Sequence, residues 1–229
     1  MRVETLVVQK LICNVLYYDG TPVLKYTIKY PEICSTKFCE TAEQLNKYYN
    51  TKVILYQKYR IRELYNLAVE DYQNSIEEEY PFRMYEVYME NTITYNKDCI
   101  LSMYFDKYEY TGGAHGMTIR EGDTWNLSNG ERVTLEELYV GDEDLKEYMT
   151  SYIIAHIKEE IDAGNDYYFE NYEELVKENF NSRNFYVTKE GVVIFYQLYD
   201  IAPYSSGIMT FTIPFRSYLD GTIQLPKCC

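Results

Sequence analysis

The two histidines of the chain, His115 and His156, are the side chains best suited to proton transfer or metal binding near neutral pH. They lie 41 residues apart. His115 stands among small residues in the run Gly112-Gly113-Ala114-His115-Gly116, which lets the backbone adopt conformations closed to other residues and lets another surface approach closely. The competing interpretation is a tight connection between strands, in which the imidazole only bonds the backbone.

His156 falls beside an apolar stripe of a predicted helix, formed by Leu145, Tyr148 and Tyr152. This position favours a packed or helix-edge histidine over a ligand. We therefore assign no catalytic or metal-binding role to His156.

The common catalytic motifs are absent. The sequence has no G-x-S-x-G elbow, no H-E-x-x-H, no phosphate-binding P-loop and no G-x-G-x-x-G. It also has no C-x-x-C pair of the kind found in zinc knuckles and thioredoxin-type redox sites. A glycoside hydrolase needs only two carboxylates, and 36 acidic residues leave that class open, although no pair is singled out. The prediction is a non-enzymatic protein that uses no metal and no cofactor.

Two loops have the composition of contact surfaces. One is the loop around His115. The other spans residues 199–207 between two predicted strands, and it combines two tyrosines, a rigidifying proline and small residues. A structural turn explains the second loop equally well on physical grounds alone. The predicted binding residues are Tyr110, Gly112, Gly113, His115, Tyr199, Pro203, Tyr204 and Ser205.

The charge of the chain limits its partners. It has 22 basic and 36 acidic residues, for a net charge of −14. Nucleic acids and anionic membrane surfaces are excluded, because both require a concentrated basic face. A basic protein partner would be attracted, although solvation of the surface also accounts for the acids. The 28 tyrosines are equally consistent with binding surfaces and with half-buried strands.

The sequence does not decide in which cellular compartment the protein works. No stretch approaches the roughly 18–20 apolar residues that span a bilayer, and the N-terminus lacks the pattern of a signal sequence. The chain is therefore either cytoplasmic or separated from its export signal or anchor. The cysteines do not decide the question, because their even number suits an oxidising compartment but a chain of this length needs no disulfides. They are Cys13, Cys34, Cys39, Cys99, Cys228 and Cys229.

Hairpins account for the predicted strands. Runs at residues 7–17 and 23–30 flank Asp19-Gly20, a strong tight-turn signal, and Pro31 is expected to end the second run. Further strands are predicted at residues 83–95, 99–110, 117–127, 185–188, 192–198 and 209–215, with turns at residues 96–98, Asn129-Gly130, 189–191 and Asp220-Gly221.

Two long helices are predicted between the hairpins. The first begins at a capping box formed by Thr41 and Gln44 and ends at residues 77–79, before Pro81. Its apolar stripe is interrupted at Arg60 and is interpreted as core; it consists of Leu45, Tyr49, Val53, Tyr56, Leu64, Ala68, Tyr72 and Ile76. The second long helix spans about residues 142–163, and shorter helices are expected at residues 134–138 and 172–179.

These elements define the predicted fold class. Strands joined by short turns pair antiparallel, so the chain is expected to be α+β, with antiparallel sheets built from hairpins and two long helices packed on one face. We expect residues 1–98 to form a hairpin-plus-long-helix subdomain and residues 99–229 to form an α+β domain. The two parts are expected to pack as one compact unit.

Several motifs in order and spacing resemble the RsiV-like domain family over roughly residues 99–226. The motifs are Tyr108 to Gly116, Trp125-Asn126-Leu127, Asn129-Gly130, Val133 to Leu138, Phe195-Tyr196-Gln197, Ile201 to Tyr204, Gly207 and Phe211 to Pro214. The preceding part looks like the companion domain found N-terminal to it, including in peptidoglycan deacetylases of the PdaC type. The resemblance implies a bacterial, mainly Gram-positive origin, an extracytoplasmic position and a sensor domain that binds lysozyme.

Two departures from the family limit what carries over. The chain shows no transmembrane helix or sigma-binding segment, and its two isolated histidines cannot supply the paired-histidine metal motif of the deacetylase domain. The leading hypothesis is therefore a non-enzymatic recognition module at the cell envelope that binds a basic protein such as lysozyme or a cell-wall glycan. The alternatives are a hydrolase of cell-wall sugars with an unassigned carboxylate pair, and a cytoplasmic structural protein that shares the fold.

Overall fold

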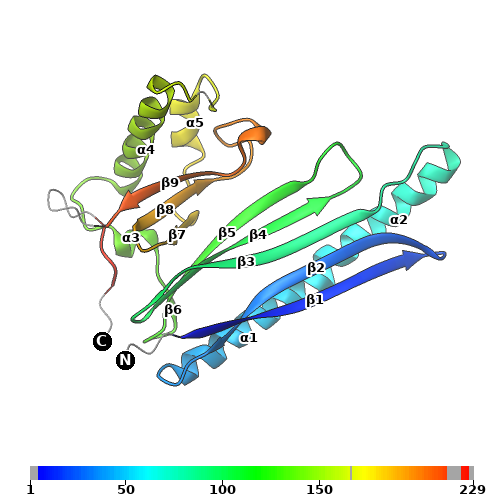
Figure 1. Ribbon diagram of the computed structural model, residues 1–229, viewed down its shortest axis with the longest axis horizontal. Helices are drawn as coiled ribbons and strands as arrows, with labels where there is room; N and C mark the ends of the chain where they lie inside the picture. Colours follow the sequence, from blue (N-terminus) through cyan, green and yellow to red (C-terminus); the bar gives the residue numbers. More distant parts are fainter. Residues whose placement is uncertain (1–4, 166, 216–222, 227–229) are drawn as a thin grey trace. The chain divides into compact units, whose positions relative to one another are not determined.

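The computed structural model describes residues 5–165, 167–215 and 223–226 (Figure 1). Its contacts group the chain into two compact units: Met1–Asn91 with Phe105–Ile119, and Thr92–Tyr104 with Arg120–Cys229. Both units combine strands with helices, and most strand pairs of the described residues are antiparallel. The predicted α+β class with antiparallel-dominated sheets is confirmed. The expected division between residues 98 and 99 stays a prediction.

The strands form two sheets. The six-stranded sheet has the order β1-β2-β3-β4-β5-β6 and the three-stranded sheet the order β7-β8-β9. The strands are β1 Leu6–Tyr18, β2 Thr21–Cys34, β3 Tyr85–Lys97, β4 Ile100–Tyr110, β5 Met117–Asn126, β6 Glu131–Arg132, β7 Phe185–Val187, β8 Gly191–Tyr196 and β9 Met209–Pro214. The helices are α1 Cys39–Tyr56, a π-helical segment Gln57–Ile61, α2 Arg62–Glu77, α3 Leu135–Leu138, α4 Leu145–Asp162, α5 Tyr172–Glu178 and a 3₁₀ turn Tyr204–Ser206.

The first hairpin follows the prediction at its turn and departs from it at its end. Asp19 and Gly20 both adopt positive φ, 46° and 78°, as a tight hairpin turn requires. Pro31 does not end the second strand, because β2 continues to Cys34 and Pro31 pairs with Gln9 of β1. Pro31 is tolerated there because it lies beyond the β2 segment that pairs with β3, so its missing N–H removes no bond to that strand.

The pair β2–β3 is parallel, in the register Leu24↔Tyr85 to Ile28↔Met89. A parallel pair needs a long crossover connection, and here the crossover is the helical segment from α1 through α2, which packs against β2. The predicted hairpins are thus confirmed, but a helical crossover links the first hairpin to the second one.

Helix α1 begins at Cys39, so the predicted capping box at Thr41 is wrong. Thr41 lies inside the first turn, and Phe38 occupies the N-cap position without a side-chain cap bond. The turn before the helix is closed instead by Ser35, whose hydroxyl accepts a hydrogen bond from the Phe38 N–H at 3.1 Å. A serine four residues before the first helical residue does not match the spacing of a capping box.

The π-helical segment Gln57–Ile61 coincides with the interruption of the apolar stripe at Arg60. The stripe advances mostly by four residues, and each such step overshoots an α-helical turn by about 40°. A π-turn holds more residues per turn and takes up part of this drift, so the buried face continues from Val53 through Ile61 and Leu64. Ile76, predicted as core, falls outside that face and is 61% exposed.

Two helices of the second unit begin at side-chain caps, and α4 begins at Leu145, three residues after the expected start at residue 142. Thr134 caps α3 in a complete capping box with Glu137, and Asp144 caps α4 by accepting from the Glu147 N–H at 3.0 Å. Helix α4 lies against the three-stranded sheet, where the Tyr152 hydroxyl donates to the carbonyl of Thr212 in β9. The predicted Asp220-Gly221 turn lies outside the described residues.

Candidate functional site

The loop of residues 197–208 joins β8 to β9, and we call its part 199–207 the tyrosine loop. Every residue of β8 is buried, and Tyr196 pairs with Met209 at the base of the loop. The Tyr196 hydroxyl donates to the Val176 carbonyl of α5 at 2.9 Å, and burial raises the pKa of that phenol well above its usual range. The loop therefore starts from a rigid, fully packed strand.

Gln197 and Asp200 form the base of the tyrosine loop. The Gln197 side chain pairs with the backbone of Arg120 in β5, accepting from its N–H at 2.9 Å and donating to its carbonyl at 2.7 Å. The Asp200 carboxylate accepts from the Gln197 N–H at 2.7 Å. Burial raises the pKa of Asp200, and the bond from the Gln197 backbone opposes that shift. These bonds fix the conformation of the first four loop residues.

Further contacts anchor the middle and end of the loop to the helical layer. Ile201 is fully buried, and its carbonyl accepts from the Phe169 N–H at 3.1 Å. The Asn179 amide donates to the Asp200 carbonyl at 2.7 Å, and the Ser206 hydroxyl donates to the Tyr167 carbonyl at 3.0 Å. A loop held at this many points presents its exposed side chains with little conformational entropy left to lose.

The tyrosine loop brings two of the predicted residues into contact. Tyr199 is 47% exposed, and its ring centroid lies 5.8 Å from that of Tyr204 at an interplanar angle of 36°. Tyr199 also adopts a φ of 69°, a strained conformation for a non-glycine residue. Pro203 and Ser205 are exposed beside the ring pair. Strain of this kind persists only where the surrounding structure holds it in place, and it is over-represented at binding and catalytic sites.

Acidic residues concentrate in the helical segment that anchors this loop. Residues 142–178 contain twelve acidic residues and three lysines, a net charge of −9 within a chain of −14. This segment includes α4 and α5, which pack against each other. The tyrosine loop thus stands next to the most acidic part of the chain.

The His115 loop belongs to the other unit and is held mainly by its backbone. The Gly113 carbonyl accepts hydrogen bonds from the Tyr110 hydroxyl and the Arg83 guanidinium, both at 3.1 Å. Gly112 adopts a φ of 83°, which explains why a glycine is needed there. The exposed His115 has its Nδ1 3.1 Å from the Gly116 carbonyl. This geometry matches a tight connection in which the imidazole bonds the backbone.

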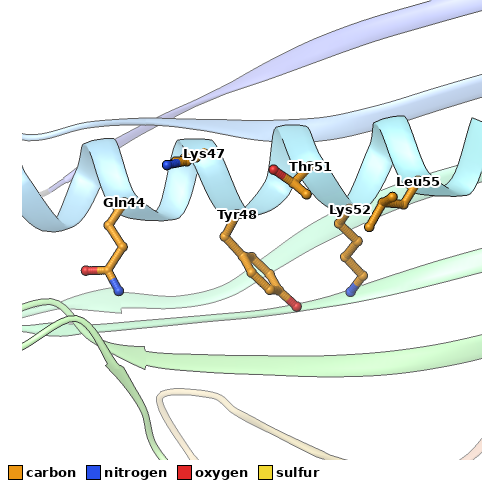
Figure 2. A pocket seen from close by; sticks show the side chains of 6 residues that line it. All are labelled: Gln44, Lys47, Tyr48, Thr51, Lys52 and Leu55. Carbon is orange, nitrogen blue, oxygen red and sulfur yellow. The ribbon is translucent and has the colours of Figure 1, made fainter.

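Helix α1 carries a hollow of about 460 Å³ that the sequence prediction missed (Figure 2). It is lined by residues at helical spacing: Gln44, Lys47, Tyr48, Thr51, Lys52 and Leu55. Figure 2 shows Tyr48 and Lys52 projecting from the same side of the helix, and the Lys52 ammonium lies 4.8 Å from the centroid of the Phe105 ring. In the sequence these residues form a second stripe on the helix, next to the apolar stripe that is buried, and this stripe is the signal that could have indicated the hollow. Its lysines are ordinary residues for an exposed helix face.

Other groups are accounted for by structure. His156 lies on α4, with its ring nearly perpendicular to that of Phe211 and its Nε2 3.7 Å from a Glu160 carboxylate oxygen, in agreement with a helix-edge histidine. Within the described ranges, no three His, Cys, Asp or Glu side chains are placed to hold a metal ion. In the same part of the chain, no helix has the length and apolar character needed to cross a membrane.

The cysteines divide into two groups. Cys13, Cys34 and Cys39 are free and exposed, whereas the buried Cys99 is disulfide-bonded. Cys228 and Cys229 lie outside the described residues.

Two family models match separate regions of the chain. A family model described as Deacetylase PdaC matches residues 19–118, and one described as a protein of unknown function, DUF3298, matches residues 136–216. No curated protein matches the chain.

Two crystal structures share the fold over nearly the whole chain. A member of the DUF3298 family from Bacteroides fragilis is 20% identical, with a TM-score of 0.66, and the match covers 93% of this chain and 92% of that one. A DUF3298 family protein from Pseudomonas aeruginosa is 16% identical, with a TM-score of 0.60 and coverage of 96% and 94%. The two matched regions are similar to PdaC-type and DUF3298-type domains, and the crystal structures show that the fold is shared. The narrower RsiV-like assignment and the Gram-positive origin stay predictions.

Proposed function

We propose that the chain is a non-enzymatic binding module associated with the bacterial cell envelope, which recognises a basic protein such as lysozyme, or a cell-wall glycan, through the tyrosine loop. The observation that supports this proposal is the ring pair of the exposed Tyr199 and the half-buried Tyr204 on a loop held by buried anchors. Tyrosine gives a large contact area at low entropic cost, and pre-ordered aromatic residues form the centres of many binding surfaces.

Charge favours a basic partner at this surface. The tyrosine loop is bonded to Tyr167, inside the segment of residues 142–178 with its net charge of −9, and to Asn179, which directly follows that segment. An acidic surface around an aromatic centre accelerates encounter with a cationic protein and contributes less as salt increases.

Two observations support the envelope association. The N-terminal region is similar to a family described as a deacetylase, PdaC, and the resemblance of the sequence to envelope sensors points the same way. Independently, Cys99 is disulfide-bonded, and disulfides persist in oxidising compartments outside the cytoplasm.

The proposal is tested by isothermal titration calorimetry with a c-type lysozyme at low and at moderate salt. We expect micromolar or tighter binding that weakens as salt increases, because screening reduces the steering charge. Tyr204→Ala should weaken the complex at least about tenfold, in line with the loss of an aromatic anchor. Tyr59→Ala is the matched control, since Tyr59 is 62% exposed in the other unit, on the π-helical segment.

The glycan and enzyme alternatives are separated in the same series. Soluble cell-wall muropeptides serve as a second titrant, and the release of reducing ends from them is measured in parallel. Binding of the muropeptides in place of lysozyme, lost in Tyr204→Ala, assigns the glycan as ligand. Absence of heat with both titrants, or an equal effect of Tyr59→Ala, would refute the proposed module, and release of reducing ends would make the chain a hydrolase.

A further inference from the structure

Strand β1 is an unpaired edge of the six-stranded sheet (Figure 1). It pairs with β2 on one side, and the strand order of the described residues places no strand on its other side. With 13 residues it is about 43 Å long, at a rise of roughly 3.3 Å per residue. Such an edge presents a row of N–H and C=O groups that can bind another extended strand.

The usual protection of an edge strand is missing from β1. Natural edges are shortened, charged or interrupted by proline. Here the only charged residue of the strand is Lys10, and its ammonium is ion-paired with Glu32 at 2.6 Å. The register irregularity of the strand, between Leu16 and Tyr17, lies near one end. Large apolar side chains are exposed along the rest, with exposed fractions of 62% for Leu6, 43% for Val8, 60% for Leu11 and 59% for Tyr17.

A partner strand for this edge must be apolar on both faces, and β1 itself meets that requirement. Antiparallel pairing of two copies about Ile12 overlaps all 13 residues. It places Lys10 opposite Asn14, so that no like charges face each other across the pair. The remaining pairs in this register are Leu6 with Tyr18, Val7 with Tyr17, Val8 with Leu16, Gln9 with Val15 and Leu11 with Cys13.

The local charge also fits a second copy. Residues 6–34 carry three lysines, at positions 10, 25 and 29, and two acids, Asp19 and Glu32, for a net charge of +1. The hairpin is therefore nearly neutral in a chain of net charge −14. Two such hairpins repel each other weakly, and a strongly basic partner gains no electrostatic attraction from this edge.

We propose that β1 pairs antiparallel with β1 of a second copy of this chain, about a two-fold axis at Ile12, so that the two six-stranded sheets become continuous. The interface is isologous, as in most homodimers, because the same strand supplies both sides. The proposal is independent of the binding function of the tyrosine loop.

The test is the solution mass of the full chain without any added partner, measured by sedimentation equilibrium up to about 100 µM, a range that includes weak interfaces. We expect twice the chain mass of 27.3 kDa. Leu11→Lys places a charge at the edge and enters the dimer twice, so dimerisation should weaken on the order of a hundredfold. Ile54→Lys is the matched control, since Ile54 on α1 is as exposed as Leu11, at 60%, and this variant should stay dimeric.

Salt dependence and hydrogen exchange complete the test. Added salt should strengthen the dimer, because it screens the repulsion between two chains of net charge −14. Backbone amides of β1 should become protected as protein concentration increases. A monomer at all concentrations, a dimer that survives Leu11→Lys, or equal losses in Leu11→Lys and Ile54→Lys would each overturn the proposal. Both variants alter exposed side chains, so far-UV circular dichroism should show unchanged folding.

Discussion

The π-helical segment between α1 and α2 is fastened by an ion pair whose strength can be measured. The Arg60 guanidinium binds both carboxylate oxygens of Glu109 in β4, with its Nε at 3.0 and 3.1 Å. The Tyr56 hydroxyl donates to the same carboxylate at 2.9 Å, and a further nitrogen of Arg60 binds Glu63 at 2.8 Å. The change to make is Glu109→Gln, which keeps the shape of the side chain and removes its charge.

The expected loss follows from burial. Charge-assisted hydrogen bonds contribute about 1.5–3 kcal/mol when shielded from water. The side chain of Glu109 is 20% exposed and that of Arg60 is 39% exposed, so solvent screening reduces this figure. We expect Glu109→Gln to lower the free energy of unfolding by about 1.5 kcal/mol, or about 3–6 °C in melting temperature for a chain of this size. Glu63→Gln, with the 59% exposed Glu63, should cost less than about 0.5 kcal/mol.

The pH dependence gives a second readout of the same pair. Burial opposes ionisation of Glu109, but hydrogen bonds from Arg60 and Tyr56 outweigh it and lower the pKa of this carboxyl below its usual 4.5. A lowered folded-state pKa stabilises the fold above the ordinary value, and this contribution is lost as pH falls through the folded value. The stability difference between wild type and Glu109→Gln should therefore be full at neutral pH and shrink below about pH 4.5.

The measurement is urea denaturation followed by circular dichroism. It is made on wild type, on Glu109→Gln, Glu63→Gln and Arg60→Met alone, and on Arg60→Met combined with each of the two glutamate changes. Coupling between Arg60 and Glu109 should exceed that between Arg60 and Glu63 in the double-mutant cycles. Equal costs of Glu109→Gln and Glu63→Gln, or additive effects of Arg60→Met and Glu109→Gln, would show that the pair does not hold the segment.

Two further changes probe the second unit. Gly122→Ala should destabilise the fold by about 2 kcal/mol or more in urea denaturation, because an added Cβ would lie 1.8 Å from the Phe185 carbonyl oxygen and β5 must shift. Gly113→Ala is the control and should change stability little, since the nearest atom to an added Cβ there, the His115 carbonyl oxygen, lies 4.0 Å away. Burial raises the pKa of Asp200, so the favourable contribution of this residue to stability is full at low pH and is lost as pH rises through the raised value. Asp200→Asn should therefore flatten the pH dependence of stability and leave the free energy of unfolding at neutral pH unchanged or slightly higher. A loss of stability at neutral pH would show instead that the bond to the Gln197 N–H outweighs the cost of burying the charge.

Local chemistry was predictable from the sequence. The turn at Asp19-Gly20 and the start of the short helix at Thr134 depend on side chains a few residues apart, and both predictions are confirmed. The interruption of the helical stripe at Arg60 was also visible, although the stripe alone could not reveal a π-turn. The prediction was wrong at the start of α1, where Ser35 closes the turn before the helix, and at Pro31, where β2 continues to Cys34.

Non-local pairing was not predictable from the sequence. The parallel register Leu24↔Tyr85 joins residues separated by the whole α1–α2 crossover, and nothing in either segment encodes it. The composition of the tyrosine loop was readable, but the positive φ of Tyr199 and the pairing of Gln197 with the backbone of Arg120, 77 residues away, come from tertiary packing. For the His115 loop the sequence left a contact surface and a tight connection open; the bonds to the Gly113 carbonyl fit a tight connection, and the binding role of the loop stays a prediction.

The most direct test of the binding role is hydrogen–deuterium exchange of the protein alone and with saturating lysozyme, or with muropeptides if those are the titrant that binds. The proposal predicts added protection in residues 197–207 and in the neighbouring segment 167–172, which the loop contacts through Phe169 and Tyr167. Exchange in the His115 loop and in β1 should stay unchanged by the partner. Protection confined to the His115 loop, or unchanged exchange in residues 197–207 at saturation, would contradict the assignment of the tyrosine loop as the recognition surface.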